Sequence, residues 1–179
     1  MNRFTRRISG AIFTIIVGLA VGWADAGADT TSHPSQPAKV SPRILGPNGY
    51  GGLQLGMTFA DARAAGYVRE DQPPDPPCRS YDLYRRGKRV GRVFISPDRG
   101  VEAIAPEERV RTAEGVKIGW PAERVKEVYP DLRLDLLPEF GALTVQVPGN
   151  PAARYRLGFS DHEHVSDIIL HLADQPCAE

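Results

Sequence analysis

Hydrophobic and polar residues alternate along most of the chain beyond its N-terminal third, and two short helical patterns interrupt the alternation. Gly52–Leu55 alternates and predicts a short extended segment that leads into a helix over Phe59–Ala65. Thr58 is placed to cap this helix, Asp61 lies in its first turn, and Gly66 is placed to end it. A helix of about two turns is unstable alone, so the pattern predicts that it packs on a sheet.

A second copy of this pattern lies 63 residues further along the chain. Gly115–Tyr129 again reads as glycine, apolar, polar, apolar, glycine, a bulky residue and then an amphipathic helix. Val125 and Val128 take the places of Ala62 and Ala65, which the helical period puts on one face. Recurrence of a pattern at a fixed spacing predicts an internal repeat.

Strand candidates follow each helix and are separated by turns rich in glycine, proline and charged residues. They are Cys78–Tyr84, Val90–Ser96 and Val101–Ala105 in the first half, and Leu132–Leu136, Ala142–Val147, Arg154–Phe159 and Val165–Leu172 in the second. At an offset of 64 residues, Val93 corresponds to Leu157 and Ile104 to Ile168, so the strands recur together with the helices. The predicted fold class is α+β, with two tandem units that each consist of a short helix followed by an antiparallel β-meander.

The first predicted repeat unit covers residues 49–109 and the second covers residues 110–179. Residues 27–48 are rich in proline and small polar side chains and lack apolar periodicity, so they predict a flexible linker. Within that linker Arg43–Leu45 is a candidate lead-in strand. Glu107–Arg111 is interpreted either as a linker between the units or as the lead-in strand of the second unit.

Residues 1–26 have the pattern of a secretory signal peptide. Three arginines precede an apolar run over Ile8–Val21, and small residues at Ala24 and Ala26 favour cleavage after Ala26 as the first choice. Ala26 and Ala28 form an equally legal site two residues later. The apolar run is about 14 residues long, short of the roughly 20 that span a bilayer, which favours a cleaved leader over an uncleaved membrane anchor. The chain is therefore predicted to be periplasmic or secreted.

The charge balance disfavours one class of partner. The chain has 22 basic and 22 acidic residues, and without residues 1–26 it keeps 19 basic against 21 acidic ones. Nucleic-acid-binding domains carry a clear basic excess, so the sequence predicts no nucleic-acid partner.

Residues 79–99 nevertheless hold seven basic side chains against Asp82 and Asp98. This basic hairpin is either an ordinary solvated hairpin or a contact for anionic lipid headgroups or an acidic partner surface.

The two cysteines, Cys78 at the start of the first meander and Cys177 after the last strand, predict one disulfide in an oxidising compartment. Neither cysteine has a CxxC partner or a neighbouring basic motif that would lower its thiol pKa. A catalytic cysteine is therefore disfavoured.

His162 and His164 are weak candidate metal ligands. They share one face of an extended segment, and Asp161 adds a carboxylate. They also fall where the first unit has a turn, so a solvated hairpin tip explains them without a metal. Ser160, Asp161 and His162 are triad residue types, but triad members converge from separate elements. The chain has no GxSxG, HExxH, phosphate-binding-loop or dinucleotide motif, so the sequence predicts neither an enzyme nor a cofactor.

The glycine-to-helix motifs resemble a known type of module. Gly52–Thr58 with its helix, and Val110–Tyr129 as the second copy, resemble the tandem module of secreted β-lactamase-inhibitor-like proteins and the single module of small outer-membrane-assembly lipoproteins. Val110–Tyr129, with a cysteine near the C-terminus, is most similar to a group of uncharacterised bacterial exported proteins. The resemblance implies units of helix plus antiparallel sheet and a non-catalytic, protein-binding role. The chain departs from that pattern in its shorter repeat and in lacking a lipid-attachment cysteine.

These features predict an exported bacterial envelope protein that is monomeric, non-catalytic and bound to another envelope protein. Tyr and Arg dominate binding hot spots, and the candidate contact residues are Tyr81, Tyr84, Arg85, Arg86, Tyr155 and Arg156. The alternative is a periplasmic small-ligand or metal binder, or a hydrolase, with its site between the two units.

Overall fold

The computed structural model describes residues 43–107, 109–136, 141–160, 163–175 and 177. The chain divides into two compact units after Pro37, and all described residues belong to the second unit, Ala38–Glu179. The predicted signal peptide, its cleavage sites and most of the predicted linker lie outside the described residues. No helix within the described ranges is long and apolar enough to cross a membrane.

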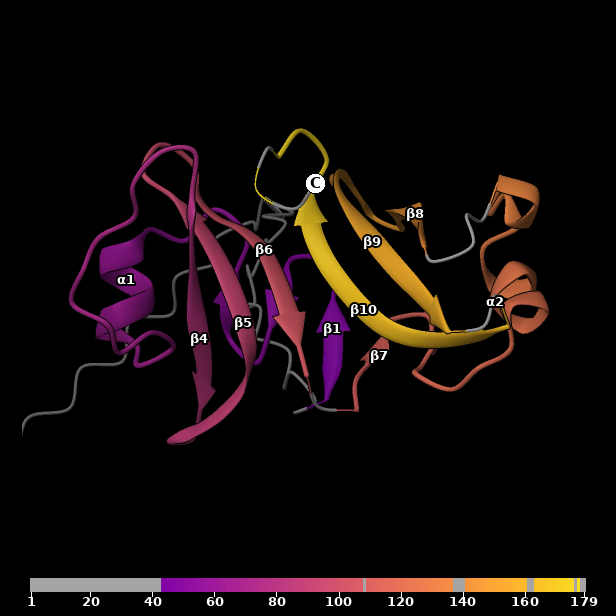
Figure 1. The fold of residues 1–179 in the computed structure, drawn as a ribbon, viewed down its shortest axis with the longest axis horizontal. Helices are drawn as coiled ribbons and strands as arrows, with labels where there is room; N and C mark the ends of the chain where they lie inside the picture. The colour runs from indigo at the N-terminus through magenta and orange to yellow at the C-terminus, as the bar shows by residue number, and fades with distance from the viewer. Residues whose placement is uncertain (1–42, 108, 137–140, 161–162, 176, 178–179) are drawn as a thin grey trace, which may run out of the picture. The chain divides into compact units, whose positions relative to one another are not determined.

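The second unit is mainly antiparallel sheet. Strands account for 48% of the residues and helices for 12%, so the fold is rich in sheet and only loosely α+β. The larger sheet has six strands in the order β4-β5-β6-β10-β9-β8 (Figure 1). These strands are β4 (Arg79–Arg85), β5 (Lys88–Ser96), β6 (Gly100–Pro106), β8 (Ala142–Val147), β9 (Asn150–Ser160) and β10 (His164–Leu172).

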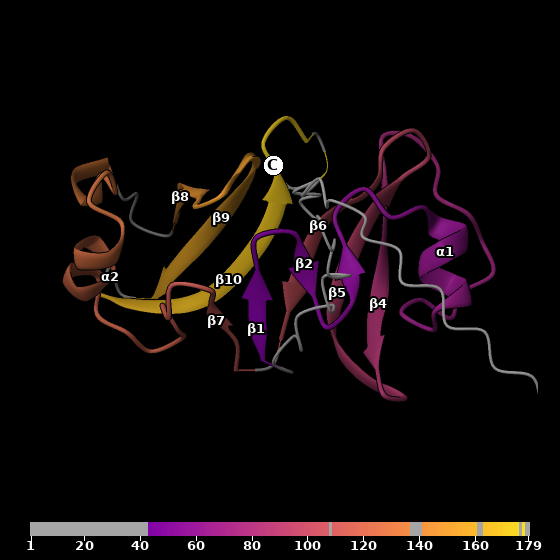
Figure 2. The same cartoon turned by 180° about the vertical axis from the view of Figure 1, so that it is seen from behind.

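A smaller sheet lies against one face of the larger one (Figure 2). Its order is β3-β2-β1-β7, and β1 and β7 pair in parallel. The remaining elements are β1 (Ile44–Gly46), β2 (Gly49–Tyr50), β3 (Leu53–Gln54), β7 (Arg111–Thr112), the helices α1 (Phe59–Ala64) and α2 (Ala122–Val128), and the 3₁₀ turn η1 (Leu134–Leu136).

The six-stranded sheet consists of two three-stranded meanders joined edge to edge. The meander β4–β5–β6 follows α1, and the meander β8–β9–β10 follows α2. Their last strands, β6 and β10, pair antiparallel in the middle of the sheet, with Ile104 opposite Leu170 and Ala103 opposite His171. The chain therefore runs twice from a helix through an outer strand to the centre of the sheet.

Strand registers in the two meanders correspond at the offset found in the sequence. In the β5–β6 ladder Val93 pairs with Ile104, and in the β9–β10 ladder Leu157 pairs with Ile168. Each residue of the second pair lies 64 positions after its counterpart in the first pair. The sequence correspondence is thus also a correspondence of backbone pairing.

Each of these two ladders contains a β-bulge at the same relative place. The extra residue is Glu102 in β6 and Ser166 in β10, again 64 positions apart. A bulge bends its strand and increases the local twist, so both central strands are bent at equivalent points.

The glycine-containing stretch before each helix is held by the last strand of the following meander. Gly56–Met57 makes two backbone hydrogen bonds with Val101 of β6, both 2.8 Å long. Gly119–Trp120 makes the same two bonds with Val165 of β10, at 2.7 and 2.9 Å. Both glycines have positive φ, 78° and 85°, which permits the turn that returns the chain to the sheet.

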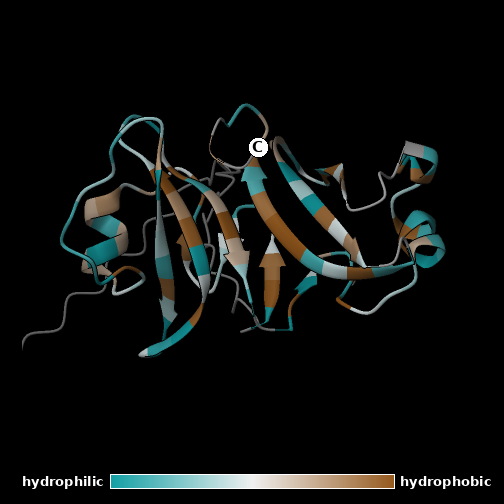
Figure 3. Ribbon diagram, viewed as in Figure 1, coloured by the Kyte–Doolittle hydropathy of each residue, from teal (hydrophilic) through white to brown (hydrophobic). Residues whose placement is uncertain are grey.

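One hydrophobic core joins the two sheets. Leu45 of β1 and Tyr50 of β2 are buried in the same cluster as alternate residues of the six long strands. Tyr155 of β9 is completely buried, and its hydroxyl donates a hydrogen bond to the carbonyl oxygen of Leu45 at 2.9 Å. Hydrophobic residues are dense along β10 and β1 (Figure 3).

The N-cap predicted for α1 is present, and the helix is one residue shorter than predicted. Thr58 Oγ1 accepts a hydrogen bond from the backbone N–H of Asp61 at 3.1 Å, and Gly66 has a positive φ just after the helix. Ala62 is fully buried, as the predicted apolar face requires. Ala65 is exposed at the C-cap of the helix, contrary to that prediction.

Six of the seven predicted strands are present, Ala142–Val147 with the predicted ends and the other five with shifted ends, and the predicted strand over Leu132–Leu136 is wrong. The backbone N–H of Leu132 donates to the carbonyl oxygen of Tyr129 at 3.0 Å, so the chain turns tightly after α2, and η1 follows. Leu132 is buried all the same. Its apolar side chain anchors a turn to the core.

Candidate functional site

The predicted disulfide is present. Cys78 and Cys177 are bonded, with their Cα atoms 5.8 Å apart and a sequence separation of 99 residues. The bond ties the segment before β4 to the segment after β10. Such a bond is compatible with an oxidising compartment outside the cytosol.

Two of the predicted contact residues, Tyr81 and Tyr155, are buried with 2% and 0% of their surface exposed. The hydroxyl of Tyr81 donates to the carbonyl oxygen of Gln72 at 2.9 Å. Tyr84 is half-buried, and the guanidinium carbon of Arg69 lies 4.1 Å from its ring centroid. The rings of Tyr81 and Tyr155 therefore belong to the core in this fold and present no contact surface.

The basic hairpin is partly neutralised by its own neighbours. Arg89 makes two hydrogen bonds to the Glu107 carboxylate, at 2.5 and 2.8 Å, and a third to Asp82 at 2.8 Å. The hydrogen bonds to Glu107 and Asp82 raise the pKa of Arg89, and the Arg89 guanidinium holds the pKa of Glu107 below its usual value. This arginine is therefore engaged within the chain.

The other predicted contact arginines also differ in their surroundings. The guanidinium of Arg85 lies 5.2 Å from the ring centroid of Tyr50. Arg156 has an ion pair with Asp167 at 3.4 Å on a partly exposed sheet face. Arg86 is exposed at the turn between β4 and β5. These residues are spread over several surfaces and do not form one site.

The structure places only one of the two candidate metal ligands. His164 is exposed at the start of β10, with its Nδ1 4.0 Å from a carboxylate oxygen of Glu163. His162 lies outside the described residues. Within the described ranges, no group of three or more His, Cys, Asp and Glu side chains is placed to hold a metal ion.

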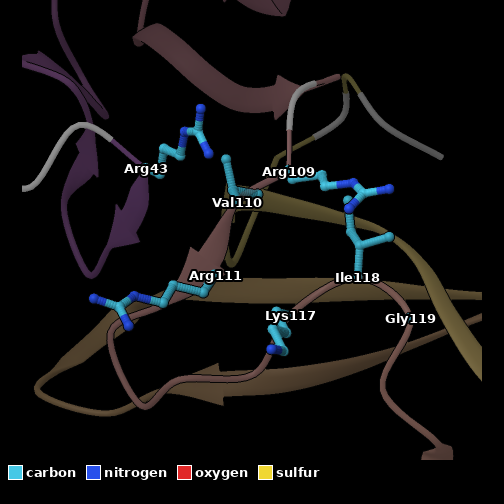
Figure 4. Close-up of a pocket in the computed structure, with 7 residues that line it drawn as sticks. All are labelled: Arg43, Arg109, Val110, Arg111, Lys117, Ile118 and Gly119. Carbon is cyan, nitrogen blue, oxygen red and sulfur yellow. The ribbon is translucent and has the colours of Figure 1, made fainter.

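A cavity of about 630 Å³ opens beside the parallel pairing of β1 and β7, at a place that the sequence did not single out. Its described lining consists of Arg43, Arg109, Val110, Arg111, Lys117, Ile118 and Gly119 (Figure 4). Four of these residues are cationic, and no carboxylate, histidine, cysteine or hydroxyl is among them. The cavity, with this lining, is called the basic pocket below.

The basic pocket exists because two paired segments separate. Arg111 and Lys117 form an antiparallel bridge, and the backbone N–H of Thr112 donates to the Val116 carbonyl oxygen at 2.8 Å. Beyond the bridge the chain turns away, since the N–H of Gly119 bonds to β10. The segments before Arg111 and after Lys117 therefore part, and their side chains line the space between them.

The third side of the pocket comes from the start of β1. The backbone N–H of Arg111 in β7 donates to the carbonyl oxygen of Arg43, the residue before β1, at 3.1 Å, which brings these two residues next to each other. Arg109 precedes the buried Val110, whose exposure is 2%. Three separate extended segments thus deliver four cations to one cavity.

The electrostatics of the basic pocket are one-sided. All four cationic side chains are exposed, and none has an ion pair or hydrogen bond with another side chain in the described part of the chain. The backbone N–H groups of Arg109 and Val110 also donate no hydrogen bond to a described residue. The described lining therefore offers cationic donors without a carboxylate acceptor.

Figure 4 shows that the cations do not meet at one point. The guanidinium groups of Arg109 and Arg111 lie on opposite sides of Val110, and Arg43 and Lys117 extend separately from the other two. A cavity of this size is in the range of ligand sites, roughly 300 to 1,000 Å³. The arrangement suits a ligand with several separated negative charges better than one compact anion.

No sequence pattern indicates the basic pocket, because Arg43 lies 66 residues before Arg109 and joins the other three cations only in the fold. The local signal was the Arg109-Val110-Arg111 alternation in a stretch interpreted only as a linker or lead-in strand. The pairing of this stretch with β1 brings in Arg43. No sequence pattern encodes that parallel pairing.

Comparisons of the chain with family models, curated proteins and solved structures found no match. The interpretation of the basic pocket therefore depends on its own geometry and charge.

Proposed function

We propose that the chain is an exported, non-catalytic binding protein that recognises an anionic ligand in the basic pocket. The observation that carries the proposal is the set of four cationic side chains around one cavity, without a described carboxylate to neutralise them. Arginine suits this task because its planar fork of donors fits carboxylate and phosphate oxygens. The described lining supplies no general acid or base pair, which supports binding without catalysis.

The two meanders with their helices are proposed to be tandem repeats, and the repeat supplies a comparison within the chain. The matching ladders and bulges support this interpretation. At the motif offset of 63, the counterpart of Lys117 in the first half is Gln54, and the counterpart of Arg111 is Asn48. The shared fold thus forms in the first half with neutral residues at these places. The charges in the second half are therefore better explained by a ligand than by folding.

Export is proposed from the leader pattern together with the disulfide. A location outside the cytosol would place the basic pocket among envelope molecules that carry phosphate and carboxylate groups. Another envelope protein remains the proposed class of partner, and the protein is proposed to act as a monomer without a cofactor.

Isothermal titration calorimetry with inositol hexakisphosphate and with citrate tests the anion site. We expect saturable binding at low salt that weakens as the salt rises from about 10 to about 300 mM, because the exposed cations are screened. The variant R109Q/R111Q should bind at least about tenfold more weakly, a loss of about 1.4 kcal/mol or more.

The matched control is R86Q/K88Q, which removes the same charge from an exposed turn away from the pocket lining. It should bind both probes as the parent protein does. If neither probe binds, or if both variants lose the same affinity, the anion site is refuted. In the second case only net charge would matter.

A further inference from the structure

Strand β8 is the outermost strand of the six-stranded sheet on the side where α2 lies (Figure 1). We infer that its outer edge is a docking site for an extended segment of a partner protein, which adds to the sheet beside β8. This segment alternates β-branched residues and carries a basic side chain that meets Asp131. The site is separate from the basic pocket, because the two cavities share no described lining residue.

The pairing of β8 with β9 fixes which backbone groups of β8 point outward. The N–H of Phe159 in β9 donates to the carbonyl oxygen of Gly141 at 3.1 Å, so every second residue from Gly141 to Val145 bonds to β9. Thr144 and Gln146 are the alternate residues, and their N–H and C=O groups point away from β9. Both are exposed, and neither N–H donates to any residue that the structure describes.

The opposite edge strand, β4, differs from β8 in composition. Asp82 of β4 and Thr144 of β8 occupy matching places, because their pairing partners Arg92 and Arg156 lie 64 positions apart. Strand β4 contains three charged residues, whereas Ala142–Val147 contains no charged residue and no proline. Charged residues and proline are what edge strands use to prevent pairing. Strand β8 lacks these obstacles to an added strand.

The outer edge of β4 is also covered by the chain itself. The N–H of Tyr84 donates to the carbonyl oxygen of Tyr67, in the segment after α1, at 2.8 Å. The segment after α2 turns tightly instead, since the N–H of Leu132 donates to the carbonyl oxygen of Tyr129 at 3.0 Å. Among the described residues, none of this second segment bonds to the backbone of β8. An unpaired strand edge is a template for another strand.

A cavity of about 510 Å³ adjoins the edge of β8 and is called the edge cavity below. Its described lining joins Thr144–Pro148 to Val128–Asp131 at the end of α2. Val128 is half-buried and Pro130 is exposed, so this wall offers apolar contact to β-branched side chains. Asp131 is the one charged residue of the described lining, and it has no ion pair with another described residue.

Charge favours a foreign basic segment over a second copy of the chain. Residues 127–179 contain nine acidic residues and three basic ones. A second copy paired through β8 would bring another Asp131 and another acidic half to the same edge, and like charges oppose such pairing. A basic side chain of a partner segment instead neutralises Asp131. Strand addition gains affinity from main-chain hydrogen bonds and specificity from alternate side chains.

Amide hydrogen exchange, followed by NMR on the full purified protein, tests whether the edge is open. In the free protein the N–H groups of Thr144 and Gln146 should exchange at least about tenfold faster than that of Val145, which faces β9. They should also exchange faster than that of Tyr84, whose edge is covered. Protection of Thr144 and Gln146 equal to that of Val145 would mean a closed edge and would overturn the inference.

Fluorescence anisotropy with labelled peptides of about eight residues, within the usual length of a strand, tests the occupant. The probe peptide alternates Val with Thr and has a Lys at each end, and its charge control has Glu in place of both Lys. Two further peptides carry N-methyl groups on the odd or on the even backbone nitrogens, which removes donors without changing the charge.

We expect the probe peptide to bind at least about tenfold more tightly than the Glu control and than one of the two N-methylated peptides, because only one set of nitrogens faces β8. It should also slow the exchange of the Thr144 and Gln146 amides. R109Q/R111Q should bind the probe peptide as the parent protein does. A loss of binding in that variant would place the peptide in the basic pocket and overturn the inference.

Variants of the edge supply matched pairs. T144P removes an outward N–H without removing a bond to β9, and it should weaken binding of the probe peptide by at least about tenfold. T144A keeps the N–H and should bind as the parent does. D131N should weaken binding by about two- to fivefold, whereas E123Q, an exposed carboxylate in the first turn of α2, should not.

Several results would overturn the inference. Equal binding of the probe and both N-methylated peptides would exclude strand addition, and this comparison holds even if T144P fails to fold. Equal binding of the Lys and Glu peptides would exclude a basic partner. A parent protein that dimerises in analytical ultracentrifugation while T144P stays monomeric would show that a second copy takes the edge.

Discussion

The pKa of the buried His171 depends on the residues that surround it. His171 lies on β10 in the middle of the six-stranded sheet, between Ala103 on β6 and Arg154 on β9, and 9% of its surface is exposed. Its Nδ1 is 2.8 Å from the Leu172 carbonyl oxygen. Burial lowers the pKa of His171 from its ordinary 6.5, and the charges of Arg154 and Arg156 add to this effect.

The lowered pKa of His171 predicts that the protein loses stability in mild acid. Below the ordinary pKa of 6.5, the unfolded chain binds a proton at this residue before the folded chain does, so protonation favours unfolding. The free energy of unfolding should fall as the pH drops from about 7 to about 5, with a slope from this residue of at most about 1.4 kcal/mol per pH unit. Urea unfolding at a series of pH values measures it.

The variant H171Q should flatten this pH dependence, and H164Q should retain it because His164 is exposed. A slope between pH 7 and 5 that is the same in H171Q and the parent would show that other groups cause it.

Among single residues, those with a local physical reason could be predicted from the sequence. The Thr58 cap needs only the neighbouring helix, and the Cys78–Cys177 disulfide needs only an even cysteine count in an oxidising compartment. Tyr81 and Tyr155 have no such local signal, because the inward or outward direction of a strand residue depends on which face the smaller sheet covers. The cations of the basic pocket could not be grouped because Arg43 joins the other three only through the parallel pairing of β1 with β7.

At the scale of elements, alternation was enough to predict strands but not the turn after α2. Leu132, Leu134 and Leu136 alternate as a strand would, yet the hydrogen bond from Leu132 to Tyr129 commits the chain to a turn. The close packing of Gly56–Met57 on β6 also depends on the tertiary fold and has no local sequence signal. Gly100 at the start of β6 has a φ of 71°, and its Cα faces the carbonyl oxygens of Gly56 and Met57.

Substitution of Gly100 tests this packing. In G100A the new methyl group would collide with both carbonyl oxygens and also strain the left-handed backbone. In the control G149A, the φ of 78° is similar, but the added methyl group meets no atom within 4 Å. Only the backbone strain of the left-handed conformation, about 1 to 2 kcal/mol, applies there. Urea unfolding should show a larger loss for G100A. Equal losses would mean that the strand start adjusts without cost.

At the scale of the whole molecule, the disulfide closes a loop that contains all six strands of the larger sheet and leaves β1, β2, β3 and α1 outside it. It joins positions 99 residues apart, so in the chain-entropy model it stabilises by at most roughly 4 to 5 kcal/mol. The sequence predicted this bond and the doubled order of helix and meander. It did not predict that the meanders join through β6 and β10, because nothing local specifies which strand edges meet.

Removal of the disulfide should lower the free energy of unfolding by an amount up to that limit. The measurement is urea unfolding of the parent protein with and without reducing agent, compared with C78S/C177S. The double variant should match the reduced parent and should not respond to the reducing agent. Identical midpoints for oxidised and reduced parent protein would show that the bond contributes nothing to stability.

The antiparallel joint between β6 and β10 also bears on ancestry. Equivalent strands that pair antiparallel are related by a local two-fold axis, which is the symmetry of a homodimer. A chain with only one half would expose the edge of the strand equivalent to β6 and β10. A second copy of the same chain could pair with that edge. Fusion of two such genes would seal both edges within one molecule and release each half to diverge. Lys117 and its counterpart Gln54 differ in charge, as such divergence would allow.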